Sequence, residues 1–199
     1  MTSADVAGLP CVSCRLMGRM NPRQSGLVIE IPEAEPAVAE PRSRLDRVAA
    51  LGVPAHVTAL FPFVTRDGIS EAVLRQVSEV AAANVPFDYR FVRTGWFGQQ
   101  VVYLAPDRPA PFRKVTKSLW AAFPECPPYG GQFEELVPHL TIGEGAALTD
   151  LLDAEEAVRS HGAVEGRALR LTLVVEGDDG LWSRLGFCVL GKNDGFQRF

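Results

Sequence analysis

The chain has 199 residues, of which 47% are hydrophobic, so it can bury a substantial core and fold without disulfide or metal cross-links. Its 24 acidic residues slightly outnumber its 20 basic ones. Proteins that track long nucleic acids non-specifically carry a strong basic excess, so the charge argues against that class. A nucleic-acid substrate would instead be met through its end or as a short fragment.

The N-terminal segment, residues 1–24, shows no hydrophobic periodicity, and we predict a disordered extension there. It contains no apolar stretch typical of a signal peptide, and no run of about eighteen apolar residues predicts a membrane span. The four scattered cysteines are typical of reduced thiols, which favours a cytoplasmic protein. Cys11 and Cys14 form a lone Cys-x-x-Cys that supplies only half of a zinc site, so we expect neither a metal nor another cofactor.

A first series of strands and helices is predicted between residues 27 and 94. One helix begins with Pro41, at an early position where proline is tolerated. A later one begins at the capping residue Ser70 and carries an apolar stripe up to Asn84. In order, we expect a strand at 27–31, a helix at 41–50, a strand that contains His56, the helix capped by Ser70, and an alternating strand at 87–92.

A second series follows the same order between residues 101 and 190. Its second helix is predicted to be capped by Thr149 and to end near Gly162. In order, we expect a strand at 101–105, a helix at 111–123, a strand that contains His139, the helix capped by Thr149, and strands at 168–176 and about 184–190.

The two series predict one structural unit present twice. Each runs strand, helix, histidine strand, helix, strand, although few residues are identical between them. We therefore predict an α+β fold with a single bilobal domain over residues 25–191, built from repeats at about 27–94 and 101–190, and a C-terminal tail at 192–199. A pseudo-twofold between such lobes would bring both histidine strands to one central cleft.

Two copies of a short motif, His56-Val57-Thr58 and His139-Leu140-Thr141, occupy those equivalent strands. Side chains at i and i+2 of a strand share a face, so each copy offers an imidazole beside a hydroxyl. Histidine suits both the base and the acid of phosphodiester chemistry, since its ordinary pKa is near neutrality. Threonine hydroxyls can donate hydrogen bonds to phosphate oxygens whose charge grows in the transition state. This scheme requires no metal.

The simplest alternative is that each histidine is a core residue, which is the commoner role of a single histidine on an apolar strand. The presence of the motif at equivalent positions of a repeat favours a shared site instead. Neither histidine has the neighbouring ligands of a metal motif. The third histidine, His161, precedes Gly162 at a predicted helix end, where the helix dipole explains it, so we place it outside the site.

Other candidate site residues flank the two motifs. Phe61 and Phe63 could stack on a nucleobase, although aromatic residues at this spacing are more often core. Tyr129 lies in a Gly-rich loop that could reach the mouth of the cleft, or it is an ordinary turn residue. Arg90 and Arg93 could border the site, and a solvated sheet face explains them equally well.

The segments HVTAL and HLTIG resemble the paired motifs of the 2H phosphoesterase superfamily, which includes bacterial 2′-5′ RNA ligase-like proteins and cyclic nucleotide phosphodiesterases. The resemblance spans about residues 27–191, and the flanks GVPAHVTALFPF and PPYGGQFEELVPHLTIG are typical of the ligase-like branch. It implies a bilobal fold with antiparallel sheets around the cleft and helices outside.

The same resemblance implies that His56 and His139 are the catalytic pair and that Thr58 and Thr141 bind the phosphate. It also implies metal-independent opening of 2′,3′-cyclic phosphates or cleavage of 2′-5′ linkages, with ligation as the reverse reaction. The sequence leaves open which histidine is the base.

Two alternatives stay open for the function. One is a noncatalytic module that binds an AMP-like nucleotide, and the other is a true 2′-5′ RNA ligase acting on RNA ends. In each case we expect a nucleotide or RNA end as the partner, no membrane and no obligate protein partner. We expect a monomer, because the two lobes already complete the cleft.

Overall fold

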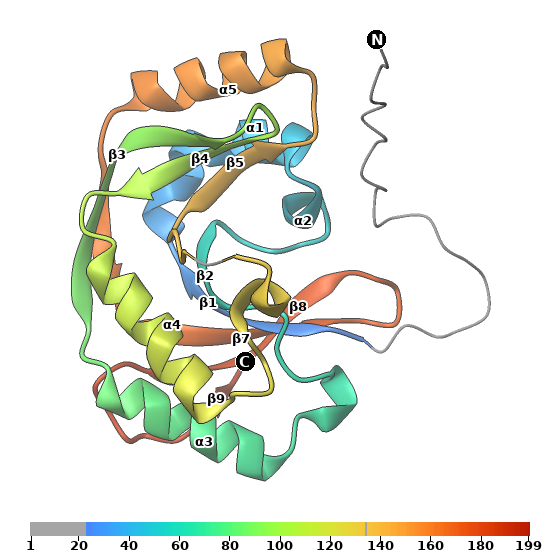
Figure 1. Cartoon of the computed structure of the whole chain (residues 1–199), viewed down its shortest axis with the longest axis vertical. Coiled ribbons are helices and arrows are strands. Elements are labelled where there is room, and N and C mark those ends of the chain that lie inside the picture. Colours follow the sequence, from blue (N-terminus) through green and yellow to red (C-terminus); the bar gives the residue numbers. More distant parts are fainter. Residues whose placement is uncertain (1–22, 134) are drawn as a thin grey trace, which may run out of the picture.

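Two antiparallel β-sheets form the centre of the molecule, and helices cover their outer faces (Figure 1). This computed structural model describes residues 23–133 and 135–199. Of the predicted extension, only Arg23 and Gln24 are described, and the Gln24 backbone N–H donates to Glu176. Cys11 and Cys14 and the rest of the predicted extension lie outside the described residues.

The sheets place the two histidine strands next to each other. Sheet A runs in the order β2 (His56–Leu60), β1 (Ser25–Glu30), β7 (Arg170–Glu176), β8 (Trp182–Val189) and β9 (Gln197–Arg198). Sheet B runs β5 (Leu140–Glu144), β4 (Val101–Pro106), β3 (Phe87–Phe97) and β6 (Val164–Ala168). Strands β2 and β5 are each the edge of their own sheet and contact each other across the junction. The two histidine strands therefore lie side by side where the two sheets meet, as expected for a shared cleft.

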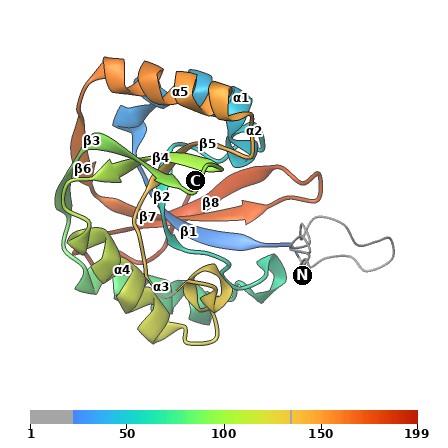
Figure 2. The same cartoon turned by 45° about the horizontal axis from the view of Figure 1, so that its top comes forward.

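Four of the five helices in the described part of the chain form two pairs, one for each sheet. The helices are α1 (Glu35–Leu45), α2 (Arg47–Ala50), α3 (Glu71–Ala83), α4 (Ala110–Ala122) and α5 (Leu148–His161). Helices α1 and α5 pack on each other and on sheet B, whereas α3 and α4 pack on each other and on sheet A. Figure 2 shows these pairs on opposite sides of the strands. None of the helices in the described part of the chain is long and apolar enough to cross a membrane.

Each lobe takes elements from both halves of the sequence. In sheet A, β1 of the first half pairs with β7 of the second, and in sheet B, β4 of the second half pairs with β3 of the first. The lobes thus differ from the repeats at 27–94 and 101–190, because the final strands of each series join the other lobe. One hydrophobic cluster runs through both sheets, with Phe91 and Phe112 among its largest buried side chains. The domain boundaries at 25 and 191 stay a prediction.

The α+β fold with antiparallel sheets and outer helices is confirmed. The helix predicted after Ser70 is α3, and the helix predicted at 111–123 is α4. Ser70 caps α3, since its hydroxyl accepts a hydrogen bond from the Val73 backbone N–H at 3.3 Å. The apolar stripe of α3 is buried at Leu74, Val77 and Ala81. Burying such a stripe is the main source of stability for a helix of this length.

The predicted helix at 41–50 is wrong in its bounds. Helix α1 begins at Glu35, ends at Leu45 and contains Pro41 in its interior. Pro36 occupies the early position that suits proline. The predicted start is wrong because it assigns Pro41 to that position. Asp46 then caps the separate short helix α2, and its carboxylate accepts a hydrogen bond from the Val48 N–H at 3.0 Å.

Three further elements differ from prediction. Ala147, without a side-chain hydrogen bond, caps α5, and Thr149 lies inside the helix. Strand β6 was missed, because its sequence, VEGRA, lacks an apolar run. The predicted tail at 192–199 contains the short strand β9, which pairs with β8.

Candidate active site

His56, Thr58, His139 and Thr141 line one cavity of about 300 Å³ between the two sheets. His56 and Thr58 lie on β2, which pairs with β1. Thr141 lies on β5, and His139 immediately precedes that strand. All four side chains are partly exposed, although they lie within largely buried strands. The structure therefore brings both copies of the motif to a single site.

The two imidazoles are held in the same way. The Nδ1 atom of His56 lies 2.7 Å from the Pro54 carbonyl oxygen, and that of His139 lies 2.7 Å from the Val137 carbonyl oxygen. A carbonyl can only accept, so Nδ1 must carry the proton in each ring. The neutral rings thus keep a lone pair on Nε2, which is the atom left to exchange a proton with a ligand.

Burial makes both rings reluctant to accept a proton. It lowers the pKa of His56 from 6.5 to about 4, with a smaller lowering from the charge of Arg42, while the hydrogen bond to Pro54 opposes the shift. Burial also lowers the pKa of His139, and the hydrogen bond to Val137 opposes it. Both rings are therefore neutral at pH 7 until an anion enters the cavity, because a nearby negative charge raises the pKa of an imidazole.

A buried ion pair stands beside His56. The Arg42 Nη2 and Asp46 Oδ2 atoms are 2.9 Å apart, and the two side chains are 3% and 1% exposed. Both residues line the cavity, and Arg42 also donates to the Val53 carbonyl at 3.3 Å, just before Pro54. Sequence reasoning missed this pair. Its signal is an arginine and an aspartate four residues apart, but such spacing is common and does not reveal burial.

Aromatic rings surround His139 instead. The ring centroid of Phe97 is 5.0 Å from that of His139, and the centroid of Tyr103 is 5.3 Å away. Glu144, at the end of β5, lines the same cavity, and its pKa is raised by burial and by the charge of Asp46. The sequence did not single out Phe97 and Tyr103, because β3 and β4 reach the site only through the pairing of sheet B, and it did not single out Glu144 at the end of β5.

Tyr129 reaches the cavity, as predicted for its loop. Its backbone N–H donates to the Phe61 carbonyl at 2.6 Å, which ties the loop to the end of β2. Tyr129 has a φ of 52°, and the two glycines after it share this left-handed conformation, which explains the Gly-rich sequence. Burial raises the pKa of Tyr129, and a hydrogen bond with the Thr58 side chain opposes the rise. The phenol thus contacts one of the two threonines of the motifs.

Phe61 also lines the cavity, with its ring centroid 6.1 Å from that of Trp182. Gly26 makes room for it, because a Cβ atom at that position would lie 3.2 Å from the Phe61 ring. Trp182 lines the cavity from β8 and was missed in the sequence, since nothing local connects it with the motifs.

Three candidates lie away from the cavity. Phe63 is 7% exposed and packs edge-on against Phe123 at 4.9 Å, because the chain has left β2 and alternation no longer sets its direction. Arg90 and Arg93 lie on β3 and form exposed ion pairs, Arg90 with Glu165 at 2.6 Å and Arg93 with Asp107 at 3.8 Å. The third histidine, His161, is exposed at the end of α5.

The cavity thus holds two imidazole Nε2 atoms and two hydroxyl donors, which is the set that phosphodiester chemistry needs. Within residues 23–133 and 135–199, no three His, Cys, Asp or Glu side chains are grouped to hold a metal ion. A two-sheet α+β fold with paired His-x-Thr strands at its central cleft defines the class of two-histidine phosphoesterases.

Comparison with known proteins agrees with this class. Residues 31–180 match the sequence model of the 2′-5′ RNA ligase superfamily, and the chain belongs to this family. Among its relatives, the "Putative phosphoesterase" of Bacillus cereus (strain G9842) is 28% identical over 159 residues, which cover 77% of this chain and 88% of the relative.

Two solved structures share the fold. The crystal structure of TT0787 of Thermus thermophilus has a TM-score of 0.58 at 18% identity and covers 84% of this chain and 98% of its own. The crystal structure of E. coli LigT complexed with 3′-AMP has a TM-score of 0.53 at 15% identity and covers 86% of this chain and 100% of its own. At these identities the likeness concerns the fold alone.

Proposed function

We propose that the protein is a metal-independent phosphodiesterase that hydrolyses 2′,3′-cyclic phosphates or 2′-5′ linkages of nucleotides or RNA ends. The observation that carries this proposal is the matched pair of imidazoles, each held through Nδ1 by a carbonyl two residues upstream and lining the same cavity. The complex of E. coli LigT with 3′-AMP supports a nucleotide as the ligand.

The reaction divides between the two rings. One neutral ring accepts a proton at Nε2 from water, whose oxygen attacks the phosphorus, and the bond from phosphorus to a ribose oxygen breaks. The other ring, protonated when the anionic substrate is bound, gives its Nε2 proton to the leaving oxygen. The hydroxyls of Thr58 and Thr141 donate to the non-bridging oxygens as negative charge grows there. One ring gains a proton and the other loses one, so the pair carries the same number of protons before and after the reaction. Proton exchange with solvent then returns each ring to its starting state.

We assign the base to His56 and the acid to His139. Burial and the charge of Arg42 lower the pKa of His56 to about 4, although the Pro54 hydrogen bond and the charge of Asp46 oppose them, whereas the pKa of His139 is lowered by burial alone against the Val137 hydrogen bond. The bound phosphate then makes His139 the ring that takes up a proton more readily. The two rings interact, so they titrate as a pair.

Phe61 and Tyr129 are the groups we propose for contact with the nucleobase. Both line the cavity, and the backbone hydrogen bond from Tyr129 to Phe61 holds them together at the end of β2. Each of the four nucleobases can stack on an aromatic ring, because each has a π-face. This arrangement supports a nucleotide substrate without a strong preference for one base.

The test is hydrolysis of the four 2′,3′-cyclic nucleotides and of a 2′-5′-linked dinucleotide with EDTA present. We expect turnover of at least one substrate at the same rate with and without the chelator, and the exposed His161→Ala variant serves as a matched control. Loss of activity on chelation would contradict a metal-independent reaction. Tight binding of mononucleotides without any turnover would favour a noncatalytic binding module, and joining of RNA ends would show the reverse direction.

The cytoplasmic location and the monomeric state stay predictions.

A further inference from the structure

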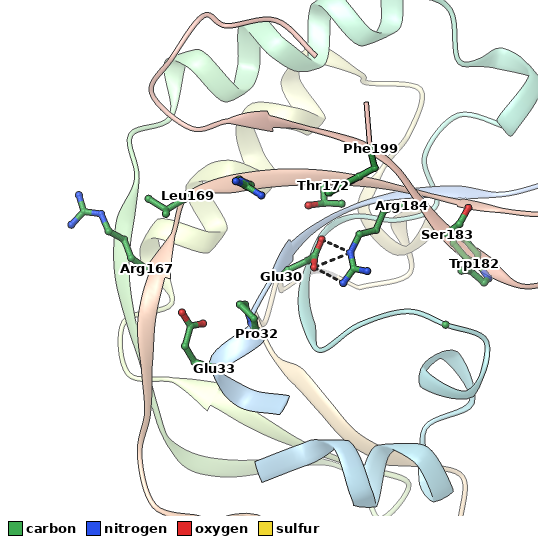
Figure 3. A pocket seen from close by; sticks show the side chains of 12 residues that line it. Glu30, Pro32, Glu33, Arg167, Leu169, Thr172, Trp182, Ser183, Arg184 and Phe199 are labelled. Atoms are coloured by element: carbon green, nitrogen blue, oxygen red, sulfur yellow. Dashed lines mark hydrogen bonds and ion pairs between the residues drawn. The ribbon is translucent and has the colours of Figure 1, made fainter. Parts of the chain in front are cut away.

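A second cavity of about 770 Å³ opens beside the candidate active site (Figure 3). We call it the arginine chamber, because its lining includes Arg167, Arg170 and Arg184, together with Thr172 and Trp182. In Figure 3 the labelled side chains extend from Trp182 at one end to Arg167 at the other. None of the three arginines takes part in the proposed reaction.

The chamber continues the active-site surface along one face of sheet A. Trp182 lines both cavities. The strand register also connects the two cavities. Glu30 of the chamber pairs with His56, and Thr172 of the chamber pairs with Val28 of the active-site cavity. Cross-strand partners point to the same face of a sheet, so a ligand that fills the active site has a direct path into the chamber.

One arginine of the chamber is already neutralised. Arg184 forms three hydrogen bonds with the Glu30 carboxylate, between 2.9 and 3.1 Å, as the dashed lines in Figure 3 show. Both residues of this pair line the chamber. Glu33, the other carboxylate there, accepts a hydrogen bond from Tyr89.

The other two arginines remain available to an anion. The Arg170 guanidinium lies 4.3 Å from the ring centroid of Phe187, and none of the ion pairs among the described residues involves it. Stacking holds the guanidinium plane and leaves its N–H edge free to bind a phosphate with two hydrogen bonds. Arg167 pairs with Asp88 at 3.0 Å, but both side chains are more than half exposed, so this pair is weak and exchangeable.

We propose that the arginine chamber is a second subsite that binds the phosphate of the neighbouring nucleotide when the substrate is an oligonucleotide. Arg170 is its main phosphate ligand and Arg167 an auxiliary one. This inference rests on the proposed function, and it makes short RNA ends better substrates than mononucleotides. The mild overall acidity of the chain fits such a substrate, because only a few phosphates would be bound.

The test compares a cyclic mononucleotide with an RNA trinucleotide that ends in the same 2′,3′-cyclic phosphate. The readout is the ratio of kcat/KM for the trinucleotide to that for the mononucleotide. We expect the parent to favour the trinucleotide, Arg170→Ala to lower the ratio about tenfold, and Arg170→Lys to lower it less, because lysine keeps the charge but loses the fork. The control is Arg44→Ala, which removes an exposed, ion-paired arginine that lines neither cavity.

A salt titration separates phosphate binding from a structural effect. Loss of one phosphate contact should reduce the slope of log KM against log salt for the trinucleotide by about 0.7, whereas a packing defect would leave the slope unchanged. If the parent hydrolyses both substrates with equal efficiency, or if Arg170→Ala leaves the ratio within about twofold, the second subsite is wrong and the proposed function stands.

If the parent hydrolyses neither of these substrates nor the 2′-5′-linked dinucleotide, the proposed function is wrong, and binding decides the subsite separately. Calorimetry would then compare a 3′-phosphorylated trinucleotide with a 3′-mononucleotide on parent and Arg170→Ala. A tighter trinucleotide whose advantage disappears in the variant would support the chamber, and equal affinities would overturn it.

Discussion

The two sides of the cleft carry the same motif in the same backbone setting but in different surroundings. On the β2 side, the ring of His56 lies near the buried Arg42–Asp46 pair. On the β5 side, the ring of His139 lies against Phe97 and Tyr103. In both, a carbonyl two residues upstream fixes Nδ1 at 2.7 Å. Local backbone geometry thus presents the reactive nitrogen, while tertiary packing makes two equivalent groups chemically different.

The largest expected effect comes from removing either ring. We expect His56→Ala and His139→Ala each to lower kcat for a cyclic nucleotide by at least about 1,000-fold, because each removes one of the two proton transfers. His161→Ala should leave kcat unchanged, since that ring is exposed on α5. Initial rates of cyclic-phosphate opening measure this. A loss of less than about tenfold in either cleft variant would break the equivalence of the two sides.

A substrate with a good leaving group sharpens the difference between the sides. A nitrophenyl phosphodiester needs no acid for its leaving oxygen, so it should restore about 100-fold of the activity lost in His139→Ala and little of that lost in His56→Ala. The measurement is the ratio of kcat/KM for nitrophenyl and natural esters in each variant. Greater rescue of His56→Ala would reverse our assignment of base and acid.

Smaller losses are expected at the threonines. Thr58→Val and Thr141→Val keep the shape of the side chain but remove a hydroxyl donor, and each should lower kcat about 100-fold if it stabilises charge on the phosphate in the transition state. Thr149→Val, inside α5, is the matched control. If only KM rises, the hydroxyls bind the substrate and its transition state equally, and the role in catalysis is wrong.

The pH profile gives the smallest effect, a displaced optimum. Activity of the free enzyme requires one ring without a proton and one with a proton, so kcat/KM should rise through the lower apparent pKa of the pair and fall through the upper one. Because burial lowers the pKa of both rings below 6.5, the optimum of kcat/KM should lie below pH 6.5. The optimum of kcat should lie higher, since the bound phosphate raises both values. An optimum of kcat/KM above about pH 7.5 would contradict the neutral rings inferred here.

The core of the site could be predicted because it depends on local geometry. His56 and Thr58 are two residues apart on one strand, and the same holds for His139 and Thr141, so a shared face follows from strand periodicity alone. The duplicated pattern then predicted a common cleft. The structure places β2 and β5 in contact, each as an edge strand.

The rest of the site depends on contacts that no local pattern encodes. Arg42 on α1 and Asp46 between α1 and α2 are charged residues that look solvent-exposed in the sequence, yet packing buries both. Trp182 reaches the cavity only because β7 inserts between β1 and β8. The composition of each sheet is not encoded locally either, since the final strands of each repeat join the other sheet.

Whether the two rings act as one catalytic unit is tested by the double variant His56→Ala/His139→Ala, assayed on a cyclic nucleotide beside the two single variants and the parent. If the two rings form one acid–base unit, loss of either already disables it. The double variant should then be slower than the slower single variant by less than about tenfold. A loss equal to the product of the two single losses would show that the rings act independently, and it would contradict the shared site.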